Sequence, residues 1–223
     1  MGAIQANHDW DWSVAEASYR KALDFEPGNA EALRRLGNLT CNLGKWDEAI
    51  DLERKSIERD PLRSNSYNNL GLCLLAADRD AEAVTALVRA LEIDPDGASR
   101  HVQLGHALLV QGKTDAALRE IQQESEEAWR LYGLALVHHS RDRRVESDAA
   151  LQELKAKYSA DAAYQIASVH AWRGEKDQAF EWLDRAYAQR DPGTSEIKGD
   201  RTMRPIMRDP RYKAFLAKLK LPE

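Results

Sequence analysis

The sequence predicts an all-α fold, a right-handed α-solenoid of about six helix–turn–helix repeats closed by a C-terminal capping helix. The main observation is a periodicity of about 34 residues along the chain. Residues 30–63 and 64–97 match position for position, with a large apolar residue, then Leu-Gly, then a small Ala, and Pro at the end. A second observation is the apolar spacing, which follows one face of a helix. Because a helix pair leaves apolar surface uncovered, neighbouring pairs must stack.

The repeat predicts each helix in turn. Pro27, Pro61 and Pro95 end the second helix of their repeats, because proline cannot continue a helix. The first repeat is truncated, with only a stub before its second helix. The pattern breaks beyond Pro192, so we expect a solenoid over residues 1–192 and a linker with a capping helix over residues 193–223. The expected helices lie at 11–25, 29–43, 46–59, 64–76, 79–93, 98–111, 114–123, 126–139, 145–157, 161–173, 176–189 and 209–219.

Composition narrows the class of protein. Hydrophobic residues make up 43% of the 223 residues and charged residues 31%, which suits long helices with one solvated face. A net charge of −5 argues against general nucleic-acid binding, and no apolar run is long enough for a signal peptide or a membrane span. Cys41 and Cys73 are the only cysteines and form no CxxC motif. We therefore expect small buried thiols, a reducing cytoplasm, no membrane and no nucleic acid.

The sequence offers little that could carry chemistry. Neither His101 with His106 nor His138 with His139 has the i,i+4 spacing that places two zinc ligands on one helix face. The chain has no nucleophile-elbow, Walker A or dinucleotide-binding motif. We therefore expect no enzymatic activity, no cofactor and no metal site. His106 and His138 are expected to line a groove or to be partly exposed.

The order of Leu-Gly, Ala and Pro in each repeat resembles the tetratricopeptide (TPR) repeat. The resemblance implies a non-enzymatic scaffold that binds a protein or peptide partner in a concave groove. Residues 8–30, 163–191 and 204–222 also resemble the TPR region of bacterial adenylate cyclases and winged-helix transcriptional regulators. That second resemblance implies an alternative, a regulatory or sensory fragment whose output domain lies outside this chain. Self-association through uncovered terminal surface is a further possibility.

In a TPR stack the first helix of each repeat lines the concave face, so the resemblance also implies which residues line the groove. An Asn amide offers both a donor and an acceptor, so a row of them could hold a peptide backbone, or could simply be solvated. Arg34, Asn38 and Asn69 match three positions of the carboxylate clamp of chaperone-binding TPR proteins, but Ser99 and Gln103 stand where its other cations belong. The expected residues of the second and third repeats are Arg34, Asn38, Asn42, Asn65, Asn68 and Asn69.

Farther along the chain the same positions become mostly apolar. An apolar concave strip is either a docking site for a partner or is filled by the chain's own segments, and both readings are retained. The expected residues are Val102, His106 and Leu109 in the fourth repeat, Arg130, Leu134 and His138 in the fifth, and Trp172 in the sixth.

Overall fold

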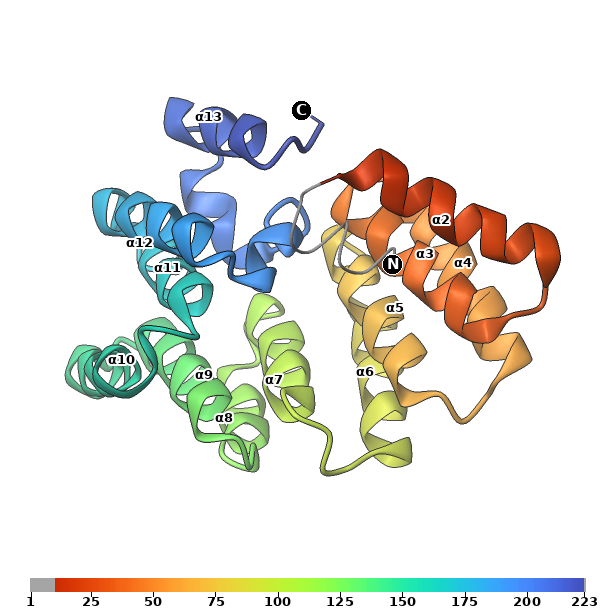
Figure 1. Cartoon of the computed structure of the whole chain (residues 1–223). Coiled ribbons are helices and arrows are strands. Elements are labelled where there is room, and N and C mark those ends of the chain that lie inside the picture. The colour runs from red at the N-terminus through yellow and green to blue at the C-terminus, as the bar shows by residue number, and fades with distance from the viewer. Residues whose placement is uncertain (1–10, 223) are drawn as a thin grey trace. The chain divides into compact units, whose positions relative to one another are not determined.

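The computed structural model describes residues 11–222, and every regular element within that range is a helix (Figure 1). The predicted helices are confirmed, and no end differs by more than two residues from its expected position. The α-helices are α2 (Trp12–Phe25), α3 (Ala30–Asn42), α4 (Trp46–Arg59), α5 (Ser64–Ala76), α6 (Asp80–Ile93), α7 (Arg100–Val110), α8 (Thr114–Ile121), α9 (Glu127–Ser140), α10 (Arg144–Tyr158), α11 (Ala163–Trp172), α12 (Lys176–Gln189) and α13 (Pro210–Lys218).

The chain divides into two compact units, which are described separately. Of the described residues, the first contains those up to Pro95, the segment Ser195–Gly199 and those from Leu216 onward. The second contains Asp96–Thr194 and Asp200–Phe215. The expected boundary at residue 192 between a solenoid and a capping part stays a prediction, because compactness does not test whether residues 193–223 form a part of their own.

Consecutive helices pack as pairs because small residues lie where they meet. A Cβ atom added at Gly71 of α5 would lie 2.5 Å from Leu87 Cγ of α6. A Cβ atom at Gly105 of α7 would lie 2.6 Å from Ile121 Cγ1 of α8. Such distances leave no room for a side chain, so the Leu-Gly positions of the repeat serve close helix contact. Local caps fix where helices begin, as where the Asn29 side chain accepts a 2.9 Å hydrogen bond from Ala32 N at the start of α3.

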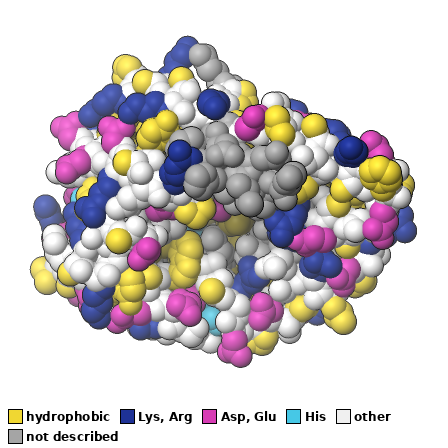
Figure 2. All heavy atoms as spheres, viewed as in Figure 1, with side chains coloured by type: hydrophobic (Ala, Val, Ile, Leu, Met, Phe, Trp, Pro, Cys, Tyr) yellow, Lys and Arg dark blue, Asp and Glu magenta, His cyan; other side chains and the backbone are white. Residues whose placement is uncertain are grey.

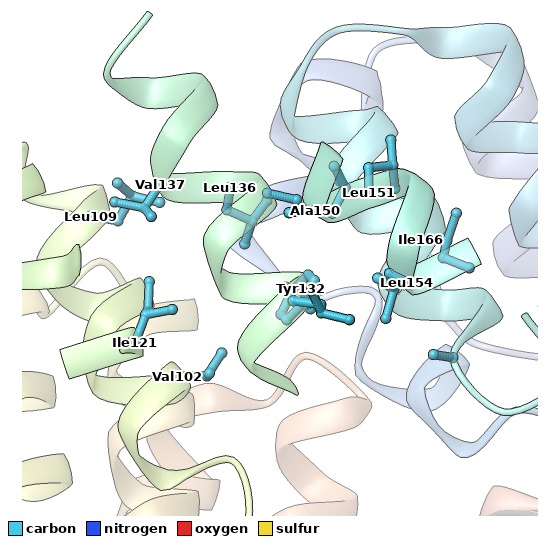
Figure 3. Packing of buried hydrophobic residues seen from close by; sticks show 14 of the residues in the cluster. Val102, Leu109, Ile121, Tyr132, Leu136, Val137, Ala150, Leu151, Leu154 and Ile166 are labelled. Atoms are coloured by element: carbon cyan, nitrogen blue, oxygen red, sulfur yellow. The ribbon is translucent and has the colours of Figure 1, made fainter. Parts of the chain in front are cut away.

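The second unit has a continuous hydrophobic core between its helices. Figure 3 shows part of it, with Ile121 of α8, Leu136 of α9, Leu154 of α10 and Ile166 of α11 all almost fully buried. Each helix therefore buries its apolar stripe against its neighbours in the stack, as a repeat architecture requires.

Two short 3-10 helices precede α13, namely η1 (Pro192–Glu196) and η2 (Arg201–Ile206). Within the second unit, η2 contacts α11, and its Met203 and Ile206 are fully buried. The following helix, α13, places Phe215 against Tyr187 of α12, with ring centroids 6.4 Å apart. In the first unit, Trp12 Nε1 donates a 2.8 Å hydrogen bond to Leu219 O, so residues after α13 cover the start of α2.

Candidate functional site

The polar residues expected in the first unit lie on α3 and α5, two helices in direct contact. Arg34, Asn38, Asn42 and Asn69 are half-buried and Asn65 is exposed, so all five contribute to the surface of the unit. We call the surface that they form the α3–α5 face. Asn68 differs, because it is only 6% exposed and its Oδ1 is buried without a hydrogen-bond partner among the described residues. Asn68 therefore belongs to the interior and not to this surface.

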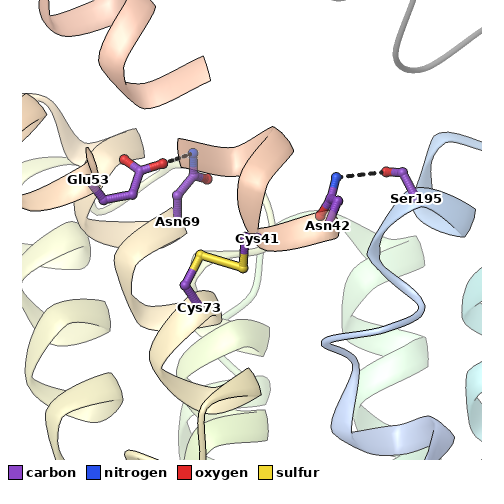
Figure 4. The surroundings of a disulfide bond; sticks show 6 residues. All are labelled: Cys41, Asn42, Glu53, Asn69, Cys73 and Ser195. Carbon is purple, nitrogen blue, oxygen red and sulfur yellow. Dashed lines mark hydrogen bonds between the residues drawn. A yellow bond between two sulfur atoms is a disulfide. The ribbon is translucent and has the colours of Figure 1, made fainter. Parts of the chain in front are cut away.

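Asn69 is held by a buried carboxyl group. Its Nδ2 donates a 3.1 Å hydrogen bond to Oε1 of Glu53, which lies on α4 and is 0% exposed (Figure 4). Burial raises the pKa of Glu53 well above its usual range, and the hydrogen bond from Asn69 and the charge of Arg34 only partly oppose this. Gly37 makes the room, since a Cβ there would lie 2.8 Å from Glu53 Oε1. The Asn69 amide thus has a fixed orientation on the α3–α5 face.

Three guanidinium groups share one carboxylate at the N-terminal end of α3. Glu31 accepts from Arg34 at 2.8 Å, from Arg35 at 2.6 Å and from Arg63 at 2.9 Å, and Arg63 also pairs with Asp60 at 3.0 Å. The hydrogen bond from Arg34 is the main cause that lowers the pKa of Glu31 to about 2. Three positive groups against two negative ones leave this end of the face cationic, although the pairs are partly solvent-exposed and individually weak.

Asn42, at the C-terminal end of α3, is contacted by a distant segment of the chain. Its Nδ2 donates a 3.3 Å hydrogen bond to Ser195 Oγ (Figure 4). Next to it, Lys198 Nζ donates a 3.2 Å hydrogen bond to Leu43 O. This end of the α3–α5 face is therefore occupied by the protein itself.

The cysteines form a disulfide bond, so the expectation of two separate thiols is wrong. Cys41 of α3 and Cys73 of α5 are bonded, with Cα atoms 5.8 Å apart (Figure 4). The reason lies in the repeat, because a separation of 32 residues, close to one repeat, brings both cysteines to neighbouring first helices. Both residues are buried, as expected. The argument for a reducing cytoplasm depended on unpaired cysteines, and it no longer holds.

In the second unit, two residues of the predicted apolar strip lie in the interior. Val102 and Leu109 of α7 are buried in the core cluster of Figure 3, together with Ile121 and Leu136. Leu134 of α9 is half-buried against the same cluster. These side chains are occupied by packing between helices, and Val102 and Leu109 have almost no exposed surface to offer a partner.

The chain's own residues also cover the polar members of this strip. His106 of α7 is buried, and its ring meets Trp172 of α11 edge-on at 6.3 Å. Burial lowers the pKa of His106, against the opposing charge of Asp200. Asp200 Oδ2 in turn accepts hydrogen bonds from Tyr164 at 2.9 Å and Ser168 at 3.4 Å. Of the two readings retained from the sequence, the one in which the chain fills its own concave surface agrees with this burial.

The remaining predicted residues of the second unit lie on α9. Arg130 donates hydrogen bonds to two backbone carbonyl groups, Glu124 O at 2.7 Å and Ser125 O at 3.1 Å, and so fixes the turn before α9. His138 is half-buried, and desolvation lowers its pKa. Arg130 therefore has a structural role within the unit, whereas His138 Nδ1 is buried without a hydrogen-bond partner among the described residues.

Sequence reasoning missed Glu53, the 195–199 segment and a cleft of about 410 Å³ in the first unit, lined by residues 44–48 and 76–79. These features depend on contacts between residues far apart in the chain, which a repeat pattern does not report.

On the face shown in Figure 2, acidic and basic side chains are interspersed, which favours local recognition over a broad charged surface. Within residues 11–222, no helix is both long and apolar enough to cross a membrane.

Comparisons with known proteins find similarity to proteins that are built from repeated helix pairs. Residues 29–96 match the family model of the tetratricopeptide repeat. Among solved structures, MamA is 25% identical, with a TM-score of 0.59 and coverage of 71% of this chain and 98% of that chain. A thermophilic TPR protein from Thermus thermophilus, TTC0263, is 21% identical, with a TM-score of 0.62 and coverage of 70% and 87%. YrrB, a TPR protein with an unusual peptide-binding site, is 20% identical, with a TM-score of 0.52 and coverage of 77% and 91%.

No curated protein matches the chain. The expected likeness to adenylate cyclases and winged-helix regulators stays a prediction. Residues 29–96 are similar to the tetratricopeptide repeat family, and the chain has the all-helical fold of TPR solenoids.

Proposed function

We propose that this protein is a non-catalytic interaction scaffold that binds an extended peptide on the α3–α5 face. The observation that carries the proposal is the grouping of partly exposed Arg34, Asn38, Asn65 and Asn69 on two contacting helices. This face lies within the residues that match the TPR family model. The second unit is the less suitable surface, because its own residues fill the corresponding strip.

The chemistry of the face suits a peptide backbone with an acidic group near one end. Asn38 and Asn65 present amides that can both donate to and accept from a backbone. Asn69 is preoriented by Glu53, so its Oδ1 can accept from a peptide N–H without a further ordering cost. The excess positive charge of Arg34, Arg35 and Arg63 around Glu31 would attract a carboxylate of the ligand.

A protein of the same fold, YrrB, has a peptide-binding site. At 20% identity that similarity supports a shared fold and nothing more, so the proposal depends on this chain's own residues. Its test is a selection of random 12-residue peptides displayed on phage against the immobilised full chain, followed by calorimetric titration of the enriched sequence. We expect enriched peptides to carry an acidic residue and to lose affinity for an Arg34→Ala variant. Enriched peptides that bind both chains equally would place the interface elsewhere.

A further inference from the structure

A segment that lies far from α3 in the sequence is bound at the C-terminal end of that helix. Residues Ser195–Gly199, here the 195–199 segment, belong to the first compact unit. Ser195 Oγ accepts a 3.3 Å hydrogen bond from Asn42, and Lys198 Nζ donates at 3.2 Å to Leu43 O. Between them, Ile197 is 0% exposed. The segment therefore presents a hydroxyl, an apolar anchor and a cation in a fixed order.

Two glycines permit this close approach. A Cβ added at Gly199 would lie 3.0 Å from Ala76 Cβ at the end of α5. A Cβ added at Gly44 would lie 2.8 Å from Lys198 Nζ, and Gly44 also has the positive φ of +82° that ends α3. A side chain at Gly199 would press on Ala76 of α5, so the surface favours glycine after the lysine, whereas one at Gly44 would displace only the end of the flexible Lys198 side chain.

Lys198 also has an electrostatic reason to bind where it does. Its ammonium group lies at the carbonyl end of α3, where the helix dipole and the unpaired carbonyl groups favour a cation. An acidic residue there would be repelled. The order of groups that fits this surface is thus Ser-x-Ile-Lys-Gly.

The segment does not satisfy the surface completely. Trp46 Nε1 is buried and has no hydrogen-bond partner among the described residues. It would lie 3.9 Å from a Cβ at Gly199, so the unpaired donor borders the bound segment. The cleft of about 410 Å³ is lined by Gly44, Trp46 and Ala76, all of which also border the segment. A partner with an acceptor for Trp46 would gain a hydrogen bond that the chain's own residues do not make.

We propose that the C-terminal ends of α3 and α5 form a peptide-docking surface and that the 195–199 segment is its built-in competitor. A partner segment with the pattern Ser-x-Ile-Lys-Gly displaces it when it also supplies an acceptor to Trp46 Nε1. This inference rests on the proposed function, since it assigns a second, self-occupied part of the peptide-binding region in the first unit. A tethered segment acts at an effective concentration on the order of mM, so the unaltered chain binds a free copy weakly.

The test asks whether a free peptide can replace the chain's own 195–199 segment on this surface. A fluorescent synthetic peptide with the sequence of residues 193–201 is titrated by anisotropy against the full chain and against an Ile197→Gly/Lys198→Gly chain. We expect the double variant to bind at least about 10-fold more tightly, because its own competitor is weakened. Two variant peptides, one with Ala in place of Lys198 and one with Val in place of Gly199, should each bind the double-variant chain about 10-fold more weakly than the original peptide does. The matched control is Arg144→Gly/Val145→Gly, which alters an exposed cation and apolar residue elsewhere and should bind like the unaltered chain.

Equal binding by the unaltered and double-variant chains would overturn the proposal.

Hydrogen exchange on the unaltered chain gives a second test that needs no variant. The Gly199 amide, which bonds to Glu196 O at 3.0 Å, should show a protection factor about 10-fold lower than the Leu43 amide, which bonds to Leu39 O at the C-terminal end of α3, because a competitor must open before the helix does. Equal protection would make the segment a permanent part of the fold and would also overturn the proposal. Because this test uses the peptide of residues 193–201 and not a selected acidic peptide, a failure of this inference is distinguishable from a failure of the proposed function.

Discussion

Glu53 shows what a single residue in a repeat can do beyond filling space. Its carboxyl group is buried, Oε1 accepts from Asn69, and Oε2 has no partner among the described residues. Burial without a full set of hydrogen bonds penalises the charged form, which is why the pKa of this carboxyl lies well above its usual range. The residue links the stability of the first unit to proton uptake.

We expect that link to appear as a pH dependence of unfolding. The folded state binds the Glu53 proton more tightly than the unfolded state, so the stabilisation is complete below about pH 4.5 and is lost as pH rises toward the raised folded pKa. Urea unfolding at a series of pH values should show the free energy of unfolding falling more steeply with pH for the wild type than for Glu53→Gln. Glu58→Gln, an exposed change on the same helix, should follow the wild type. Identical slopes for all three chains would mean that the pKa of Glu53 is not raised in the folded state.

The two clamp-like residues should differ in what they affect. Arg34→Ala should lower the affinity for a selected acidic peptide by roughly 10- to 150-fold. This corresponds to the loss of a hydrogen bond to a charged group, which contributes about 1.5–3 kcal/mol. Asn69→Ala should in addition destabilise the fold by about 1–3 kcal/mol, because Glu53 loses its hydrogen-bond donor. Calorimetry and thermal unfolding separate the two effects, with Glu58→Ala as the control for both. Stability unchanged by Asn69→Ala would contradict the role assigned to the buried carboxyl.

Between helices, the position of each glycine sets how close a pair can approach. Gly71→Leu should destabilise the protein by about 1–3 kcal/mol or more, because even its Cβ would meet Leu87 at 2.5 Å. Gly28→Leu is the matched control, since the nearest atom to a Cβ there is Arg59 Nε of a flexible side chain, at 3.6 Å. Thermal denaturation should separate the two variants clearly. Equal midpoints would show that the α5–α6 contact tolerates a side chain.

The disulfide bond acts on the same scale, because it joins the first helices of adjacent repeats. Its loop of 32 residues should stabilise the folded state by about 3–4 kcal/mol through the lost entropy of the unfolded chain. Thiol titration of the denatured, unreduced protein should find no free cysteine. Reductant should lower the urea midpoint of the wild type and leave that of Cys41→Ala/Cys73→Ala unchanged. Two free thiols in the unreduced protein would contradict the bond.

Across the whole molecule, the features that sequence predicted are those that local chemistry determines. The helices followed from the positions of Pro27, Pro61 and Pro95 and from apolar spacing, because these signals act within one or two turns. The pairing of Cys41 with Cys73 and the contact of Lys198 with Leu43 depend on residues brought together by stacking. The burial of Val102 was missed because a groove position and a core position have the same spacing on a helix.

The C-terminal cap provides a prediction at this largest scale. A repeat stack needs its terminal apolar face covered. We expect α13 to do this, because its buried Phe215 packs against Tyr187 of α12 and Arg211 lies over the Phe180 ring at 4.4 Å. Phe215→Ala should therefore cost about 3–5 kcal/mol of stability, and the uncovered face of α12 should promote self-association. Lys213→Ala, an exposed change on the same helix, should do neither. Thermal unfolding and light scattering after size-exclusion chromatography measure both effects. A monomeric Phe215→Ala chain of unchanged stability would mean that α13 is not the cap of the stack.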